Sequence, residues 1–380
     1  MTATIAWALI NSYYDRLPYP EVGLMRAVEP WSGHFEIGRV LWVSAHWGQF
    51  TKAGWSFLQH GQGVGLLDNG GSYVSLTDPK GEHLTIIVET MKREDSLCAH
   101  SSSVPYTTTN QTATFQLDDS FAHVQQLYVF LTDLRTTDVG KSFVYQGVIQ
   151  PDKGSFTLNL PVGILYTVST INGTKGSYQS PASTPFPLPY ADNFDSRQTF
   201  SEAPYFSDQS GSFEIVEASG GHGKTMRQMV TQHPISWCTE AKYPYSVLGD
   251  SNWKQPLNIT ADILIENNGT AFVAVGVTRG GCGDGSPGIV LSVSTVNGGL
   301  WQLSGSTELT NPLVSGPMEL KPGSWHTISL VVLSDHSEAF INGEIVGQCD
   351  LSASSFTGLA AIGTSWDFVQ FDNFHLQSAS

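Results

Sequence analysis

The acidic residues near the amino terminus are the first candidates for acid and base chemistry. Two carboxyl groups about 5 to 5.5 Å apart can cleave a glycosidic bond with retention, one as acid and base and the other as nucleophile. Glu29 stands out because it lies beside Trp31 in the loop sequence EPWSGHF. One carboxyl group cannot fill both roles, so we expect Glu29 to be a hydrogen-bonding loop residue. The four acidic candidates are Asp15, Glu21, Glu29 and Glu36.

Two apolar segments would position these carboxyl groups. Residues 4–10, TIAWALI, are too few for a free-standing helix, and we predict a fully buried strand. Residues 39–50, RVLWVSAHWGQF, place Val40, Val43 and Trp47 at helical spacing and predict a helix. A buried strand, a loop and a helix are typical of one βα unit of a barrel. A single unit has no partner for its buried faces, so we expect this segment to be the least stable part of the chain.

From Trp55 onward the apolar residues alternate with period two, which indicates antiparallel strands. Turn sequences at 68–71 (DNGG) and 78–81 (DPKG) separate the first of them. Residues 180–190, SPASTPFPLPY, suit neither strand nor helix and predict a linker. Further alternating strands follow, and the Asn-Gly pair at 342–343 predicts a tight hairpin, because both turn residues must tolerate positive φ.

The predicted fold class is therefore mostly β, in three parts joined by one linker. We assign residues 1–53 to the incomplete, carboxyl-terminal end of a (β/α)8 barrel and 54–179 to a small β-sandwich. The linker covers 180–190, and residues 191–380 form a lectin-like jelly-roll β-sandwich of the concanavalin type.

Composition excludes some partners. The 380 residues carry 18 Lys+Arg against 34 Asp+Glu, a formal charge of −16, so nucleic acid is disfavoured as a partner. No apolar run approaches the roughly 18 to 20 residues that span a bilayer, and we predict no membrane span. The amino terminus also lacks the basic region and cleavage site of a signal peptide.

Several segments, in order along the chain, resemble the galactosylceramidase family of glycoside hydrolases. The likeness is nearly free of gaps and covers almost the whole chain. The segments are residues 5–35, 70–78 (GGSYVSLTD), 200–217 (FSEAPYFSDQSGSFEIVE), 233–237 (HPISW), 248–253 (LGDSNW) and 368–374 (FVQFDNF).

The resemblance implies an activity for the whole protein. The family hydrolyses the β-galactosyl bond of galactosylceramide and related galactolipids by double displacement, without a catalytic cofactor. It implies a lysosomal or secreted location and a small lipid-presenting activator protein, saposin-like, as partner. The family's two catalytic glutamates sit on barrel strands that would precede Met1. We therefore expect Met1 to be internal to a longer chain, and this chain alone to be inactive.

The resemblance also assigns four substrate-binding residues. Trp7 and Tyr19 match positions that line the galactose pocket, where an indole stacks on the sugar and a phenol oxygen bonds a hydroxyl. Trp237 matches a tryptophan at the edge of the active site; a place in the sandwich core is the equal alternative. His100 stands where the family has an arginine, and a histidine is cationic mainly below its unperturbed pKa of about 6.5. Sugar contact by His100 would therefore be confined to acidic pH, with a surface loop histidine as the alternative.

A structural calcium site is also implied. Asn193, Asp195 and Asp372, with the main-chain carbonyl of Lys224, resemble the oxygen ligands of a calcium ion in the lectin domain. Calcium takes six to eight oxygens, and the first and last strands of a jelly roll can be neighbours. Strand-end caps and turn hydrogen bonds are the alternative role for these side chains.

The cysteines and glycosylation sequons favour an extracytoplasmic protein only weakly. No CxxC spacing suggests zinc. Cys282 and Cys349 are either a disulfide or two free thiols, and the resemblance pairs Cys98 with a cysteine upstream of Met1. The four cysteines are Cys98, Cys238, Cys282 and Cys349. The four sequons are at Asn110, Asn172, Asn258 and Asn268.

A second hypothesis comes from another class of protein. The chain would then be a stand-alone, lectin-like carbohydrate-binding module that recognises sugars without catalysis. A reading frame upstream of Met1 with a Trp-Ser-Ser-Glu-like nucleophile segment would exclude it.

Overall fold

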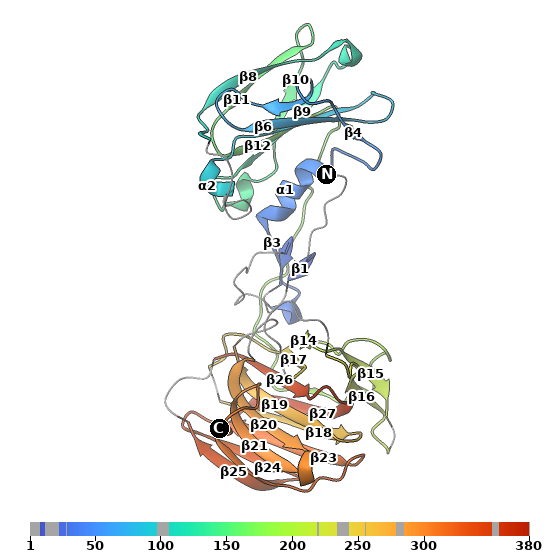
Figure 1. The fold of residues 1–380 in the computed structure, drawn as a ribbon, viewed down its shortest axis with the longest axis vertical. Helices are drawn as coiled ribbons and strands as arrows, with labels where there is room; N and C mark the ends of the chain where they lie inside the picture. Colours follow the sequence, from blue (N-terminus) through green and yellow to red (C-terminus); the bar gives the residue numbers. More distant parts are fainter. Residues whose placement is uncertain are drawn as a thin grey trace. The chain divides into compact units, whose positions relative to one another are not determined.

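The computed structural model describes residues 8–11, 23–27, 29–96, 106–218, 220–233, 243–254, 256–278, 285–351 and 357–379. Strands dominate, which confirms the predicted mostly-β class (Figure 1). The chain divides into two compact units. The first consists mainly of Glu36–Gln179, and the second mainly of Ser180–Ser380 together with Ala27–Phe35.

A seven-stranded antiparallel sheet is the centre of the first unit. Its strands are β4 (Ser56–Phe57), β5 (Val64–Leu66), β6 (Ser72–Thr77), β7 (Leu84–Glu89), β9 (Leu127–Asp133), β10 (Val144–Ile149) and β12 (Ile164–Ser169). The order is β10-β9-β12-β7-β6-β4, with β5 beside β6. A second sheet pairs β8 (Gln111–Gln116) with β11 (Ser155–Leu160). The predicted turn at 78–81 joins β6 to β7, and the Gly81 amide donates to the Asp78 carbonyl at 3.1 Å.

The two sheets pack face to face as a small sandwich. Leu84, Ile86 and Val88 alternate along β7 and share one apolar cluster with Phe156 and Leu158 of β11. This arrangement follows from the period-two pattern in the sequence, since successive strand residues point to opposite faces. The residues between them, Thr85 and Ile87, are buried as well, so both faces of the sheet are covered.

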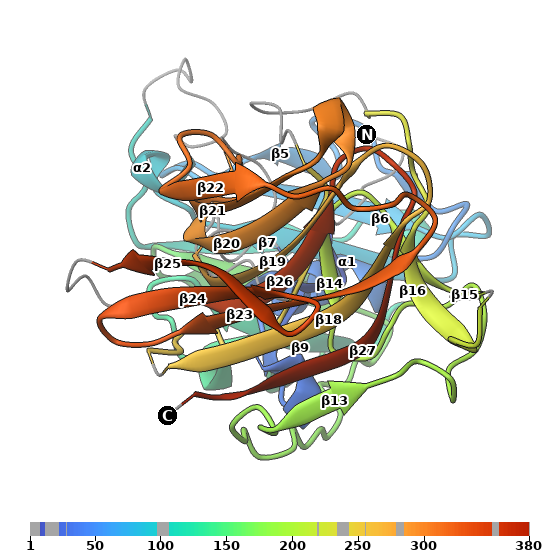
Figure 2. The same cartoon turned by 90° about the horizontal axis from the view of Figure 1, so that it is seen from below.

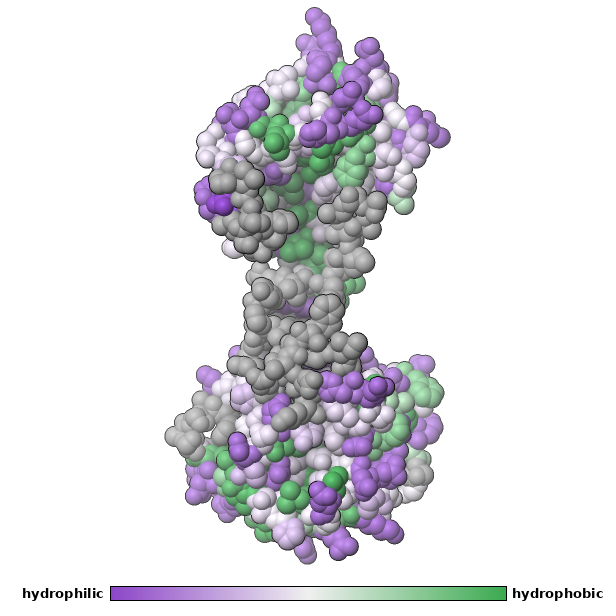
Figure 3. All heavy atoms as spheres, in the orientation of Figure 1, coloured by the Kyte–Doolittle hydropathy of each residue, from purple (hydrophilic) through white to green (hydrophobic). Residues whose placement is uncertain are grey.

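Helix α1 (Arg39–Gly48) covers the second face. The helix itself is confirmed, but its predicted apolar face is wrong: Val40 and Trp47 are 45% and 37% exposed. Figure 3 shows apolar side chains at the surface of this unit. The residues that pack inward are Trp42 and Ala45, in one cluster with Phe50, Phe130 and Phe143. The expectation that this helix has no partner is also wrong, because the sandwich supplies one.

A buried histidine joins α1 to the sheet. His46 is fully buried; its Nδ1 lies 2.7 Å from the hydroxyl of Thr167 on β12, and its Nε2 lies 2.8 Å from the hydroxyl of Thr132 on β9. Its ring contacts Phe143 edge to face at 5.1 Å. Burial lowers the pKa of His46 to about 3, because an imidazolium ion cannot be solvated there.

Short elements complete the first part of the chain. The expected buried strand is wrong where it is described, since Leu9 and Ile10 are 62% and 51% exposed. The remaining elements of the amino-terminal half are β1 (Ile10–Asn11), β2 (Met25–Arg26), β3 (Glu36–Ile37), α2 (Arg93–Ser96), and the 3-10 turns η1 (Pro30–Ser32), η2 (Asp119–Phe121) and η3 (Val139–Lys141).

The second unit is a jelly-roll sandwich of two antiparallel sheets, which Figure 2 shows as separate layers. One sheet runs β15-β16-β27-β18-β23-β24-β25, with β13 beside β27; the other runs β14-β17-β26-β19-β20-β21-β22. The first sheet contains β13 (Tyr190–Asp192), β15 (Phe213–Glu217), β16 (Lys224–Gln228), β18 (Leu257–Ile265), β23 (Trp325–Val332), β24 (His336–Ile341), β25 (Glu344–Asp350) and β27 (Val369–Ser378). The second contains β14 (Ser207–Ser210), β17 (Tyr245–Leu248), β19 (Thr270–Val277), β20 (Pro287–Ser294), β21 (Leu300–Ser306), β22 (Val314–Pro317) and β26 (Leu359–Thr364); η4 (Val296–Gly298) precedes β21.

The main core of this unit lies between the two sheets. Ile263 and Phe371 from one sheet and Val273 and Leu291 from the other belong to the same buried cluster. The hairpin predicted at 342–343 is confirmed: Asn342 and Gly343 have φ of 53° and 82° and connect β24 to β25.

The buried His46 makes the stability of the first unit depend on pH. Its folded pKa of about 3 lies below the unfolded value of about 6.5. Between these values the unfolded chain binds a proton that the folded chain does not. Stability should therefore fall by about 1.4 kcal/mol for each pH unit below about 6.5, until about pH 3. We expect His46→Gln to lower stability at neutral pH and to flatten this slope in denaturant unfolding of the first unit.

His123→Gln provides the matched control, because His123 is an exposed histidine of the same unit. Its pH slope should equal that of the wild type. An unchanged slope in His46→Gln would show that other groups cause the acid sensitivity.

Candidate functional site

Several predicted site residues lie outside the described part of the chain. Their roles stay predictions. These residues are Trp7, Asp15, Tyr19, Glu21, His100 and Trp237.

The two described carboxyl candidates at the amino-terminal end both have partners. Glu29 precedes η1, and its carboxylate accepts a hydrogen bond from the Ser183 hydroxyl. Glu36 on β3 forms an exposed ion pair with Arg26 at 3.1 Å. Glu29 is thus the hydrogen-bonding loop residue that the sequence predicted.

Side chains of the loop around Glu29 contact the predicted linker, residues 180–190. The Trp31 indole donates to the Thr184 carbonyl at 2.8 Å and contacts Phe186 edge to face at 5.2 Å. The His34 ring nitrogen Nδ1 lies 2.9 Å from the Pro181 carbonyl oxygen. The linker is irregular up to Tyr190, as predicted, but side chains from the amino-terminal loop fix it in place.

Three of the four predicted calcium ligands lie close together. The Asp195 carboxylate accepts hydrogen bonds from the Lys224 amide at 2.9 Å and from the Asn193 side-chain amide at 3.0 Å. Gly223 has φ of 59°, and a Cβ there would collide with the Asp195 carboxylate. A glycine is therefore needed for the backbone of this loop to approach Asp195 so closely.

The fourth predicted ligand, Asp372, lies on β27, which pairs with β16 through Met226 and Phe371. Asp372 is 2% exposed, and its carboxylate lies 2.7 Å from Nδ1 of His222 and accepts the Asn373 amide at 2.7 Å. Burial raises the pKa of Asp372, while His222 opposes that rise. A cation at this carboxylate would offset the cost of burial in the same way.

Two further residues lie near this carboxylate, and one of them, Asp262, raises the pKa of Asp372 further by charge repulsion. The His222 ring stacks on Trp325 with centroids 3.9 Å apart. Asp262, opposite Asp372 on β18, accepts hydrogen bonds from Thr327 at 2.5 Å and Asn373 at 2.8 Å. Within the described ranges no three His, Cys, Asp or Glu side chains converge on one metal position. The predicted calcium ligands are two carboxylates, one side-chain amide and one main-chain carbonyl. Only two of them are acidic side chains, so such a site would not contain three.

The predicted sequons differ in accessibility. Asn110, Asn172 and Asn268 are exposed. Asn258 is half-buried on β18, and its side-chain oxygen accepts a hydrogen bond from Ser329 at 3.1 Å. Asn258 is the least accessible of the four for a glycan.

Cys349 is the one cysteine in the described segments. Cys98, Cys238 and Cys282 lie outside them, so the pairing of Cys282 with Cys349 stays a prediction. Burial raises the pKa of the Cys349 thiol.

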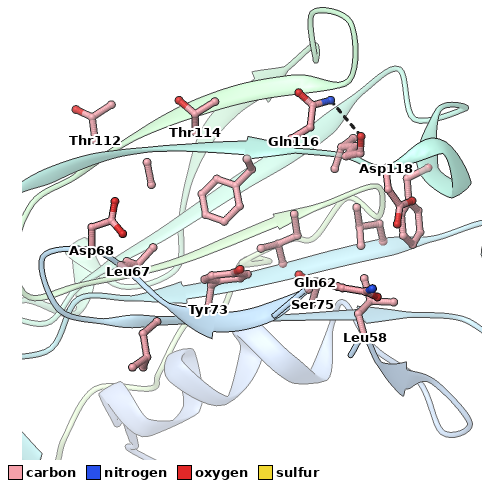
Figure 4. Close-up of a pocket in the computed structure, with 18 of the residues that line it drawn as sticks. Leu58, Gln62, Leu67, Asp68, Tyr73, Ser75, Thr112, Thr114, Gln116 and Asp118 are labelled. Atoms are coloured by element: carbon pink, nitrogen blue, oxygen red, sulfur yellow. Dashed lines mark hydrogen bonds between the residues drawn. The ribbon is translucent and has the colours of Figure 1, made fainter. Parts of the chain in front are cut away.

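A cleft with a cavity volume of about 480 Å³ opens between the two sheets of the first unit. Figure 4 shows Tyr73 and Leu67 on the floor side, with Thr112 and Thr114 on the far side of β8, pointing away from the cavity. Asp68 and Asp118 lie at opposite ends of the cleft (Figure 4). Polar side chains, among them Gln62, Gln111 and Gln116, line the cleft beside the apolar edge of the sandwich core. The two carboxylates lie at opposite ends and do not form an acid and nucleophile pair.

A second cleft of about 560 Å³ lies on the seven-stranded sheet of the second unit. Hydroxyl, amide and carboxylate groups line it together with apolar side chains. Sequence analysis missed this cleft, because its residues come from β19, β20, β21 and four connecting segments. The alternation of Ser292 and Ser294 with Leu291 and Val293 along β20 is the pattern that marks a polar outer face.

No helix in the described segments is long and apolar enough to cross a membrane.

Three family profiles match the chain in order. "Glycosyl hydrolase family 59" matches residues 1–49, "Glycosyl hydrolase family 59 central domain" matches 58–175, and "Galactocerebrosidase, C-terminal lectin domain" matches 208–379.

Curated relatives agree with these profiles. The chain is 39% identical over 400 residues to a galactocerebrosidase of Salmo salar, which covers 100% of this chain and 57% of the relative. It is 39% identical over 398 residues to a galactocerebrosidase of Homo sapiens, which covers 100% of this chain and 56% of the relative. The chain therefore spans little more than half the length of these relatives. The ordered profiles and the identity along the whole chain show that it belongs to glycosyl hydrolase family 59.

Proposed function

We propose that the protein to which this chain belongs hydrolyses the β-galactosyl bond of galactosylceramide and related galactolipids with retention of configuration. The observation that carries the proposal is the 39% identity to galactocerebrosidases along the entire chain. The acid/base and nucleophile glutamates would come from barrel strands upstream of Met1. The two described carboxylates of the amino-terminal segment support this origin of the catalytic pair. Glu29 already binds the Ser183 hydroxyl, and Glu36 already pairs with Arg26.

The chain's own part would be to bind the substrate. Trp7 and Tyr19 would contact the galactose, and Trp237 would bring the lectin domain to the edge of the pocket. His100, in place of an arginine, would donate to a sugar hydroxyl mainly at acidic pH. That restriction suits the lysosomal or secreted location that we propose, with a saposin-like protein presenting the lipid.

We also propose a structural calcium ion held by Asn193, Asp195, Asp372 and the Lys224 carbonyl. The contact of the Lys224 amide with Asp195 and the pairing of β16 with β27 support it, because they bring residues from distant segments to one edge of the sheet. The ion would supply no chemistry. It would neutralise carboxylates and join the start of the lectin domain to its last strand.

One prediction of this proposal concerns catalysis. The purified 380-residue chain should hydrolyse an aryl β-galactoside no faster than buffer between about pH 4 and 7. The reason is that each absent catalytic group contributes on the order of 10²- to 10⁴-fold. Glu29→Gln is the control. Hydrolysis that survives Glu29→Gln contradicts the proposed mechanism, and hydrolysis that it abolishes makes Glu29 catalytic.

Another prediction of this proposal concerns calcium. Calcium at about 100 times its Kd should stabilise the lectin domain by roughly 2.7 kcal/mol, which raises Tm by several degrees. Thermal unfolding with calcium and with chelator measures the shift, which Asp372→Asn should reduce. Asp335→Asn is the matched control, because Asp335 also contacts a histidine, His336, at 2.8 Å, but on the exposed surface.

Equal melting of the wild type with calcium and with chelator would show that no stabilising site exists. A calcium shift that persists in Asp372→Asn would place the ion elsewhere and leave Asp372 as a hydrogen-bonding partner of His222.

A further inference from the structure

The cleft on the seven-stranded sheet of the second unit has the features of a ligand site. Its volume of about 560 Å³ lies in the range of small-molecule sites. We propose that this cleft binds a neutral hexose, from a glycan or from a glycolipid headgroup. The binding follows from the cleft itself and does not require hydrolysis.

Strand register places the polar groups in rows across the sheet. Ser294 on β20 lies between Thr270 on β19 and Leu300 on β21, while Ser292 lies opposite Gln302 on β21. All five residues line the cleft. Hydroxyl and amide groups held on paired strands are more rigid than groups on loops, so they are already arranged for a ligand.

The cleft contains unused hydrogen-bonding capacity. Ser292 is only 3% exposed and has no hydrogen bond to a described residue, but its hydroxyl is not one of the fully buried atoms without a partner, so it faces the cleft. Gln302 donates to the Leu309 carbonyl at 3.0 Å, which leaves its side-chain oxygen open. One oxygen of Asp367 accepts the Ser365 hydroxyl at 2.6 Å, which leaves the other open. All three groups line the cleft and none is a buried polar atom without a partner, so a polar ligand that enters the cleft can pair with them.

The charge of the cleft selects a neutral ligand that donates hydrogen bonds. Asp367 is the single ionisable acid that lines it, and the described lining contains no Lys, Arg or His. Phosphate and sulfate would meet a carboxylate without a cation, in a chain of formal charge −16. The hydroxyl groups of a sugar can donate to the open oxygens of Asp367 and Gln302 and also accept from Ser292.

Apolar groups beside these polar groups fit the other side of a sugar ring. Tyr243 and Leu309 line the cleft, and Val296 and Leu300 are 44% and 40% exposed. The CH groups of a hexose can pack on such side chains while its hydroxyl groups face the polar row. This mixture fits a hexose better than a hydrocarbon chain, which would leave the polar groups unpaired.

The test measures binding of methyl β-galactoside to the 380-residue chain by calorimetry or NMR titration, with thermal melting of every variant as a check on folding. Asp367→Asn should weaken binding roughly tenfold or more, because it replaces a charged acceptor. Ser292→Ala should weaken binding about fivefold without loss of stability, because the wild-type hydroxyl has no protein partner.

Asp350→Asn is the matched control, because Asp350 is an exposed carboxylate on β25 of the other sheet. Its affinity should equal that of the wild type. The proposal is overturned if the wild type does not bind methyl β-galactoside or galactosylceramide vesicles, or if folded Asp367→Asn and Ser292→Ala bind as well as wild type. Preference for glucose 6-phosphate over the neutral glycoside would also overturn it.

Two further arms distinguish the sources of the sugar. Phosphatidylcholine vesicles with and without galactosylceramide are compared with the soluble glycoside. Binding that depends on Asp367 and occurs with the soluble glycoside assigns the cleft to glycans in general. Binding that depends on Asp367 but occurs only with galactosylceramide vesicles assigns it to the lipid headgroup.

Discussion

The last strand of the chain is the element on which the second unit depends. β27 pairs with β13, β16 and β18, so residues from both ends of this unit meet in one ladder. Its inward residues Phe371, Phe374 and Leu376 are fully buried. The pairing with β18 shifts register between Thr260 and Asp262. Such an irregularity redirects side chains, and here it lies opposite Asp372, the buried carboxylate that contacts His222.

The first unit depends on a different constraint, the covering of its sheet on both faces. One face packs on β8 and β11, and the other receives α1, with His46 between Thr132 and Thr167. An apolar residue in place of His46 would remove one hydrogen bond from each of two buried hydroxyls, leaving Thr132 with the Phe143 amide and Thr167 with the main-chain carbonyl of residue 46. The imidazole completes the pairing of both hydroxyls, and burial favours its neutral form. The same arrangement that holds the helix therefore makes this unit sensitive to acid.

Most of the fold could be predicted because it depends on local patterns. Alternation gives the strands, and the Asn-Gly pair at 342–343 gives the hairpin because few residues tolerate positive φ. The packing face of α1 could not be predicted. Val40 and Trp47 are more apolar than His46, yet the threonine partners of His46 come from β9 and β12, 86 and 121 residues away in sequence. The contact between Asp372 and His222, separated by 150 residues, has no local pattern either.

The cleft of the second unit shows that local sequence patterns also fail to predict a binding site whose residues come from distant segments. A sheet optimised for stability alone would carry branched apolar residues on the outward positions of β20, as it does at Val290. Further along the same face, Ser292 replaces such a residue although its hydroxyl finds no partner among the described residues. This hydroxyl faces the cleft and is not one of the buried polar atoms without a partner. A ligand in the cleft can pair with this hydroxyl and with the open oxygens of Gln302 and Asp367, which favours a ligand that carries several hydroxyl groups.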